Sequence, residues 1–368
     1  MEHEFTAQIK QILAKEFGDD SESIYGASPL IQYLNIKTRS ATSGSKARGS
    51  FANLYAVYVL IEDYLKNGFD RQKNYSDYKG AKFSDLFQRQ RELPFGSKLQ
   101  NHALNSRMNE EFKKYFPQVE YTPILRNLKT NRYWINENLL RIAVGRKEYN
   151  ISKSIIAIVD KYVETKRDAF KRFIETSERL KRIETEDDPR VESFIMGLLA
   201  PNQDARIFEI VSYAILKYFY HDQTVYFGFD LENIQEENLK LYKTGRTNAN
   251  DGGIDFVMRP LGRFFQVTET LDVRKYLLDI DKLEKYPITF VIKSEDSIER
   301  LRQKLQEGAE KRYLVKAIVE RYMNCIEEII NLHILQERLK ESVSQGYLRN
   351  VLDEIILQSK VEFNYEEE

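Results

Sequence analysis

The chain has 368 residues, of which 42% are hydrophobic and 31% are charged. This balance is typical of a folded globular protein and excludes a chain that is disordered throughout, because there are enough apolar side chains for at least one core. No apolar run reaches the roughly 20 residues that a membrane-spanning helix needs, and the opening residues MEHEFTAQIK lack the pattern of a signal peptide. The single cysteine, Cys325, excludes an intrachain disulfide and a cysteine-rich zinc site. We therefore expect a cytoplasmic protein without a membrane partner.

The net charge is −1, but the charges are unevenly distributed along the chain. Residues 31–182 contain 30 Lys and Arg against 16 Asp and Glu, a local excess of 14 positive charges. A basic segment in a nearly neutral chain can neutralise the phosphates of a nucleic acid. Ordinary solvated helix faces would produce the same excess, so charge alone does not separate the two interpretations.

Apolar spacing predicts that most of the first 190 residues are helical. Helical stripes are clear in FANLYAVYVLIEDYL, residues 51–65, and in the segment from residue 152 to residue 182. The charged stretch 178–190 contains TEDDPR, which is typical of a linker.

Two segments of this first region combine features that suit nucleic acid. A loop rich in Ser, Thr and Gly, residues 38–50, carries Arg39, Lys46 and Arg48. The segment RNLKTNRYW, residues 126–134, has three cations beside two aromatic rings that could stack on bases. Such a segment is more often a helix end with an aromatic anchor.

The pattern changes after residue 190. Residues 204–220 are apolar almost all round, which predicts a buried helix. Strands are then predicted for TVYFGF, IDFVMR, RFFQVTE and PITFVIK, with a turn at Pro260-Leu261-Gly262 and a helix over LDVRKYLLDIDKLEKY. From Ser294 onward the spacing is helical again. We therefore expect an α+β fold, with a mixed sheet flanked by helices and mostly helical regions at both ends.

Two polar residues interrupt the apolar strands. Asp255 stands at the start of IDFVMR, and Gln266 lies within RFFQVTE on the same face as Thr268. A short turn would hold the two strands side by side, and two oxygen ligands from adjacent strands suit Mg²⁺, which keeps several waters and accepts phosphate oxygens. The alternative is a hairpin whose polar residues face water. The strongly apolar strands favour a central position, where a carboxylate needs a partner.

Glu209 is the third candidate. It lies on the predicted buried helix and shares a face with Tyr213 and Leu216. A buried carboxylate is costly unless it is paired. Glu209 could form a structural salt bridge with Arg206 or Lys217, or it could complete a metal site or orient its ligands.

The loop before Asp255 has side chains of the kinds that contact phosphates and bases. Gly252 and Gly253 allow the backbone to approach a ligand closely. The contacting candidates are Arg246, Asn248 and Asn250.

These segments resemble the core of the PD-(D/E)xK nuclease superfamily, in particular type II restriction endonucleases and more loosely the Mrr-type nucleases. The resemblance covers residues 204–296. It implies that Asp255 corresponds to the family's Asp, Gln266 to its second metal ligand and Glu209 to the acidic residue of the leading helix. It also implies a Mg²⁺ cofactor and double-stranded DNA as the substrate.

The sequence departs from this family at Thr268, where the family usually has a lysine that positions or polarises the attacking water. Lys275 on the following helix or Lys293 at the end of the third strand could supply the charge. Glu269 could act as a ligand if a bulge redirects it. A site that binds metal poorly or not at all is the fourth possibility.

The resemblance implies a site-specific deoxyribonuclease with three regions: a basic DNA-recognition region over 1–190, a catalytic core over 191–296 and a helical region over 297–368 that could form a dimer surface. Symmetric cutting of both strands requires two sites, so we expect a homodimer. The alternatives are a modification-dependent Mrr-type nuclease, a non-cleaving DNA-binding protein on a decayed nuclease core and a purely structural helical protein.

Overall fold

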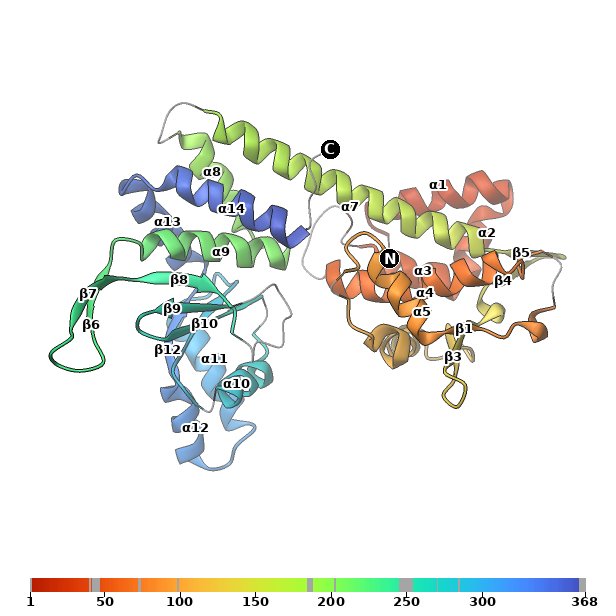
Figure 1. The fold of residues 1–368 in the computed structure, drawn as a ribbon. Helices are drawn as coiled ribbons and strands as arrows, with labels where there is room; N and C mark the ends of the chain where they lie inside the picture. The colour runs from red at the N-terminus through yellow and green to blue at the C-terminus, as the bar shows by residue number, and fades with distance from the viewer. Residues whose placement is uncertain are drawn as a thin grey trace. The chain divides into compact units, whose positions relative to one another are not determined.

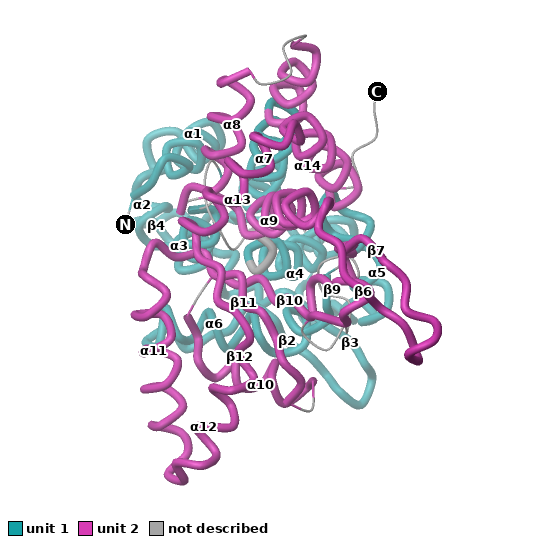
Figure 2. The backbone as a smooth tube through the Cα atoms, turned by 90° about the vertical axis from the view of Figure 1, so that its left-hand side faces the viewer, with its two compact units in different colours: residues 1–172 teal, residues 173–368 magenta. Residues whose placement is uncertain are grey.

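The structure is a computed structural model that describes residues 2–39, 41, 47–71, 74–97, 99–183, 188–201, 203–244, 254–269, 271–283 and 285–363. Its contacts divide the chain into two compact units, residues 1–172 and 173–368 (Figure 2). The α+β class predicted from the sequence is confirmed. Among the described helices, none combines the length and the apolar character needed to cross a membrane.

Unit 1 is built around α4, a long helix whose buried side chains form the centre of one hydrophobic core. The helical prediction for residues 51–65 is confirmed by α4, and that for residues 152–182 by α7. The helices that begin in this unit are α1 (Thr6–Phe17), α2 (Ser21–Ala27), α3 (Pro29–Lys37), α4 (Ala47–Lys66), α5 (Phe83–Glu92), α6 (Met108–Tyr115) and α7 (Ser152–Lys181).

Unit 1 also contains strands that the helical spacing did not predict. Antiparallel pairing joins β1 (Ala81–Lys82), β3 (Arg132–Ile135) and β2 (Ile124–Asn127) in that order, and β4 (Arg141–Val144) pairs with β5 (Lys147–Asn150). The interpretation of RNLKTNRYW as a helix end was wrong, because this segment is the end of β2, the turn and the start of β3. Strands of at most four residues are too short to establish an alternating pattern.

Unit 2 combines helices and strands, with a run of five consecutive strands among its described residues after its first two complete helices. Its elements are α8 (Pro189–Leu198), α9 (Ala205–Phe219), β6 (Thr224–Phe227), β7 (Gln235–Asn238), β8 (Lys240–Lys243), β9 (Phe256–Arg259), β10 (Arg263–Thr268), α10 (Val273–Lys282), β11 (Ile288–Ile292), α11 (Ile298–Glu310), α12 (Lys316–Asn324), β12 (Ile326–Ile330), α13 (Leu332–Ser344) and α14 (Leu348–Phe363). The candidate linker overlaps the end of α7 and the start of α8, and its residues 184–187 lie outside the described residues.

The central sheet of unit 2 has the order β12-β11-β10-β9-β8. Strands β8, β9 and β10 are antiparallel, whereas β10, β11 and β12 are parallel, so the sheet is mixed as predicted. The purely helical prediction after Ser294 was wrong at β12. Its buried residues Ile326, Ile329 and Ile330 have the i, i+3, i+4 spacing of a helix, although they form a strand.

Helices cover both faces of this sheet (Figure 1). Helices α8, α9, α13 and α14 share one core with Phe256, Phe265 and Val291, and helices α10, α11 and α12 share the other core with Phe290 and Ile292. Because side chains alternate along a strand, β10 and β11 contribute to both cores. The functional roles expected for the three sequence regions stay predictions.

We expect Phe290→Ala to lower the free energy of unfolding by about 3–5 kcal/mol, because the ring is fully buried on β11 and packs against Tyr276 at a centroid distance of 4.6 Å. Denaturant titration measures the change. Leu314→Ala is the control, since Leu314 is exposed and should change stability by less than about 0.5 kcal/mol. A loss below about 1 kcal/mol at Phe290 would contradict its place in the core.

Candidate functional site

The polar residues identified in the sequence gather at one edge of the central sheet. Strand β10 is parallel to β11 and antiparallel to β9, so the ends of β10 and β11 meet the start of β9. Asp255 directly precedes β9, Gln266 and Thr268 lie in the second half of β10, and Lys293 directly follows β11.

The Asp255 carboxylate is bound to the backbone of the neighbouring strand. Its Oδ2 accepts a hydrogen bond of 2.6 Å from the Val267 amide, and its own amide donates to the Phe265 carbonyl at 2.9 Å. On the other side, the amide and hydroxyl of Thr244 donate to the Asp255 carbonyl at 3.1 and 3.2 Å. These contacts hold Asp255 between the residue that follows β8 and the end of β10.

The Gln266 side chain is 5% exposed and contacts the same part of the backbone. Its Nε2 donates to the Val267 carbonyl at 3.2 Å, whereas its Oε1 is buried and accepts no hydrogen bond within the described part of the chain. A buried acceptor without a donor is unfavourable, so this oxygen suits a cation or a water molecule. Asp255 and Gln266 therefore both contact the main chain of Val267. Asp255 accepts through its carboxylate oxygen Oδ2, and Gln266 donates through Nε2, which leaves its Oε1 unsatisfied among the described residues.

Glu209 lies on α9, and its carboxylate forms an ion pair of 3.0 Å with the Lys243 ammonium group on β8. Both side chains are almost buried. Sequence reasoning missed Lys243, because the largely polar segment before the loop did not predict strand β8. The partners considered from the sequence were wrong: Arg206 pairs with Asp204, and Lys217 pairs with Glu354.

Glu209 and Gln266 belong to opposite faces of the sheet. Helix α9 shares its core with Phe265 and Val267, so the alternating Gln266 and Thr268 point to the α10 face. There Thr268 hydrogen-bonds to the Tyr276 hydroxyl, which opposes the rise in the pKa of Tyr276 caused by burial. Because Glu209 and Gln266 lie on opposite faces, Glu209 is badly placed to act as a third metal ligand beside Gln266. Its ion pair with Lys243 suits a role in orienting the edge of the sheet.

Lys293 lies beside the position where the resembling family has its lysine. Its amide donates to the Thr268 carbonyl at 2.9 Å, and its side chain is only 3% exposed. The ammonium group is 3.2 Å from the Glu269 carboxylate and also donates to the Gln203 carbonyl. Lys275, in contrast, is exposed on α10. Of the two lysines considered from the sequence, the structure brings Lys293 to this edge of the sheet, with its ammonium group on the α9 face near the Phe208 ring.

The residues expected to contact DNA are only partly described. Arg39 is exposed after the end of α3. The backbone of Arg48 belongs to the first turn of α4, but its side chain lies outside the described residues, as do Lys46, Arg246, Asn248 and Asn250. Contact of these residues with DNA stays a prediction.

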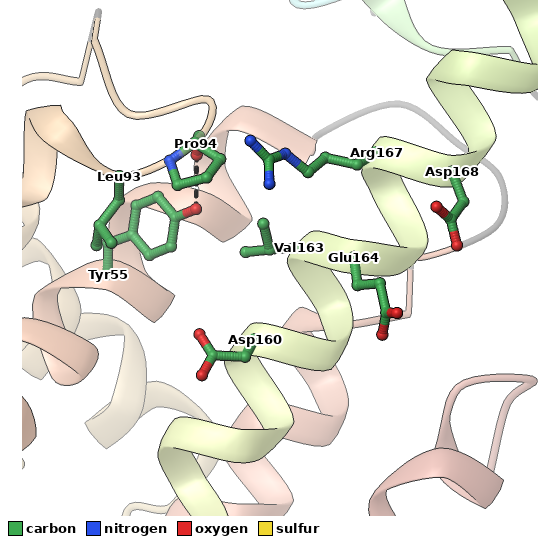
Figure 3. A pocket seen from close by; sticks show the side chains of 8 residues that line it. All are labelled: Tyr55, Leu93, Pro94, Asp160, Val163, Glu164, Arg167 and Asp168. Atoms are coloured by element: carbon green, nitrogen blue, oxygen red, sulfur yellow. Dashed lines mark hydrogen bonds between the residues drawn. The ribbon is translucent and has the colours of Figure 1, made fainter. Parts of the chain in front are cut away.

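Unit 1 has a cavity of about 380 Å³ between α4, the residues after α5 and α7 (Figure 3). The Tyr55 hydroxyl donates to the Pro94 carbonyl at 2.6 Å along one wall. Three carboxylates against one guanidinium give this cavity a negative balance, which does not suit a phosphate. Its lining residues are Tyr55, Leu93, Pro94, Asp160, Val163, Glu164, Arg167 and Asp168.

Among the described side chains, no group of three or more His, Cys, Asp or Glu residues could hold a metal ion. A cation at the edge of the sheet would therefore depend on Asp255, the Gln266 amide oxygen and water. No family model matches the chain, and neither a curated protein nor a solved structure matches it. The resemblance to the PD-(D/E)xK nucleases rests on the sequence motif alone.

We expect Lys243→Met to destabilise the protein by about 3 kcal/mol, because it removes the cation that pairs with the buried Glu209 carboxylate. Equilibrium unfolding in denaturant measures the effect. Lys240→Met, an exposed lysine on the same strand, is the matched control. Adding Glu209→Gln to Lys243→Met should restore part of the lost stability, and a double variant less stable than the single one would refute the pairing.

Proposed function

We propose that this protein is a magnesium-dependent type II restriction endonuclease that hydrolyses phosphodiester bonds of double-stranded DNA at a specific sequence. The observation that carries the proposal is the arrangement at the edge of the sheet. Asp255 and Gln266 both contact the main chain of Val267, and Lys293, whose ammonium group is buried, donates its backbone amide to the Thr268 carbonyl. Two oxygen donors and a cation are the groups that phosphodiester hydrolysis requires.

The donors at this edge suit Mg²⁺. The ion prefers oxygen ligands and keeps several waters, so one carboxylate and one amide oxygen can suffice together with a phosphate oxygen of the substrate. Asp255 would bind through its carboxylate, and Gln266 would bind through Oε1, which lacks a hydrogen-bond donor among the described residues. When bound, magnesium supplies Lewis-acid activation of the phosphate and of a water nucleophile.

The two lysines would have different tasks. Lys293, paired with Glu269, lies at the same edge of the sheet but on the α9 face, so it would raise the positive potential at the phosphate from across the end of the sheet rather than by direct contact. Lys243 pairs with Glu209 and is followed directly by Thr244, which binds the Asp255 carbonyl. The Glu209–Lys243 pair would therefore orient Asp255 without contacting the substrate.

For the substrate, we propose that basic residues of segment 31–182 outside residues 113–132, together with Arg246, Asn248 and Asn250 of the loop that precedes Asp255 in the sequence, contact DNA through phosphates and base edges. Arg39, Lys46 and Arg48 are the candidates in the first region. A cytoplasmic homodimer would provide one site for each DNA strand.

We expect cleavage of plasmid DNA to require Mg²⁺ and to fall roughly 100-fold or more in Asp255→Asn, which keeps an oxygen for the Val267 amide but removes the ligand charge. Gel analysis of single-turnover cleavage measures the loss. Asp222→Asn makes the same chemical change at an exposed position of the same unit and should cut normally.

The same assay separates the alternatives. Discrete fragments support a restriction enzyme, whereas cutting of methylated plasmid alone would identify a modification-dependent nuclease and contradict the proposal. Undiminished cutting by Asp255→Asn would refute the site. Binding of DNA with salt-dependent affinity and no cutting under any condition would identify a DNA-binding protein without nuclease activity.

We expect Lys293→Met to lower the cleavage rate by roughly 100-fold while DNA binding in Ca²⁺ is unchanged, because the lost charge acts on the reacting phosphate. Lys275→Met is the matched control and should cut at the wild-type rate, since Lys275 is exposed on α10. Thermal unfolding checks that Lys293→Met is folded, and Lys293→Arg should retain more activity. Equal losses in Lys275→Met and Lys293→Met would contradict the assignment.

A further inference from the structure

Strands β6 and β7 form a hairpin that is separate from the central sheet. They pair with each other and, within the described residues, form a sheet of two strands. Figure 1 shows this hairpin extending away from the sheet and helices of unit 2. We call residues 224–238 the acidic hairpin.

The acidic hairpin exposes large apolar side chains. Phe229 and Leu231, at its tip, are 96% and 90% exposed, and Tyr226 and Ile234 are also exposed. Among the described residues of the hairpin, Val225 is the one that packs against the core of the unit. An isolated two-stranded hairpin is marginally stable in water, and a patch of exposed apolar side chains marks an interaction surface.

Hydrogen bonds hold the turn at the tip of the hairpin in a defined conformation. Asp230 Oδ1 accepts hydrogen bonds from the amides of Glu232 and Asn233 at 3.0 and 2.9 Å. At Gly228, an added Cβ would lie 2.5 Å from the Asn233 carbonyl oxygen, so the chain closes tightly there. A fixed turn loses little conformational entropy when it binds, which suits docking.

The charge of the hairpin excludes DNA as its partner. It contains Asp230, Glu232, Glu236 and Glu237, and no Lys or Arg from residue 224 to residue 239. Four carboxylates repel phosphates. Two such hairpins would also repel each other, so the partner surface must be apolar with a basic rim.

This chain carries a surface of that chemistry in unit 1. Residues 113–132, which run from the end of α6 through β2 and the following turn to the first residue of β3, contain five Lys and Arg against one Glu. Leu128 in the turn is 70% exposed, and Tyr115, Tyr121 and Leu125 are exposed as well. We call this segment the basic hairpin surface. It matches the acidic hairpin in both charge and apolar character.

We propose that the acidic hairpin of one protomer docks on the basic hairpin surface of a second copy of this chain, twice across a two-fold axis. The choice of a second copy rests partly on the proposed function, because cutting two DNA strands needs two sites. Phe229 and Leu231 supply the buried apolar area, and the opposite charges set the orientation of the two copies.

The first test is the mass of the full chain in solution without DNA, measured by sedimentation equilibrium against the 43.5 kDa of one chain. The wild type should be a dimer, and Phe229→Ser with Leu231→Ser should weaken its dissociation constant at least roughly 30-fold. Leu314→Ser, an exposed leucine before α12, is the control and should leave the dimer intact. A wild type that is monomeric at about 100 μM would overturn the proposal.

A charge exchange identifies the partner surface. Glu232→Lys and Lys129→Glu should each weaken the dimer roughly 10-fold, and the two together should restore it. Both residues are exposed, so the variants should fold as the wild type does. A dimer that depends on Phe229 but is not restored by the exchange would refute the basic hairpin surface as its partner.

These measurements are independent of the proposed nuclease. Loss of the dimer is read from mass alone, without Mg²⁺ or DNA. A dimer disrupted as expected in a protein that never cuts DNA would refute the nuclease and retain the interface. A monomer that cuts DNA would refute the interface and retain the nuclease.

Discussion

The pairing of β10 with both of its neighbours is the constraint on which the rest of unit 2 depends. Antiparallel register to β9 brings Phe265 opposite Phe256, and parallel register to β11 brings Thr268 opposite Ile292. Because side chains alternate, the same register assigns Phe265 to the α9 core and Gln266 to the α10 face. A shift of β10 by one residue in this register would turn each of its side chains to the opposite face. Phe265 would leave the α9 core, and Gln266 would be buried in its place.

The polar residues at this edge are buried, so leaving any of them unpaired costs free energy. Two nearly buried ion pairs, Glu209 with Lys243 and Glu269 with Lys293, lie between the sheet and α9. Well-packed apolar residues would often be as stable as such pairs, so their presence points to something other than stability alone. Gln266 has the complementary feature, an oxygen without a donor among the described residues. The edge of the sheet thus has buried charge pairs on the α9 face and, among the described residues, an unsatisfied oxygen on the α10 face.

Sequence reasoning predicted α9, β9, β10 and β11, because these segments are strongly apolar and the strands are bounded by turn signals, and so it brought Asp255 and Gln266 close together. It could not predict β12, since the spacing of Ile326, Ile329 and Ile330 equals that of a helix. Nor could it find Lys243, because the ion pair with Glu209 depends on how β8 packs against α9. Long-range pairing of this kind leaves no local trace in the sequence.

The position of Lys293 has a consequence for how such sites are recognised. It follows Thr268 by 25 residues, with α10 between them, yet its amide binds the Thr268 carbonyl. The parallel register of β10 and β11 therefore brings a lysine next to the Thr268 carbonyl although the two residues are far apart in the sequence. A search for a short consecutive signature would not find this lysine, whereas a comparison of neighbouring strands in three dimensions would find it one strand away from Thr268.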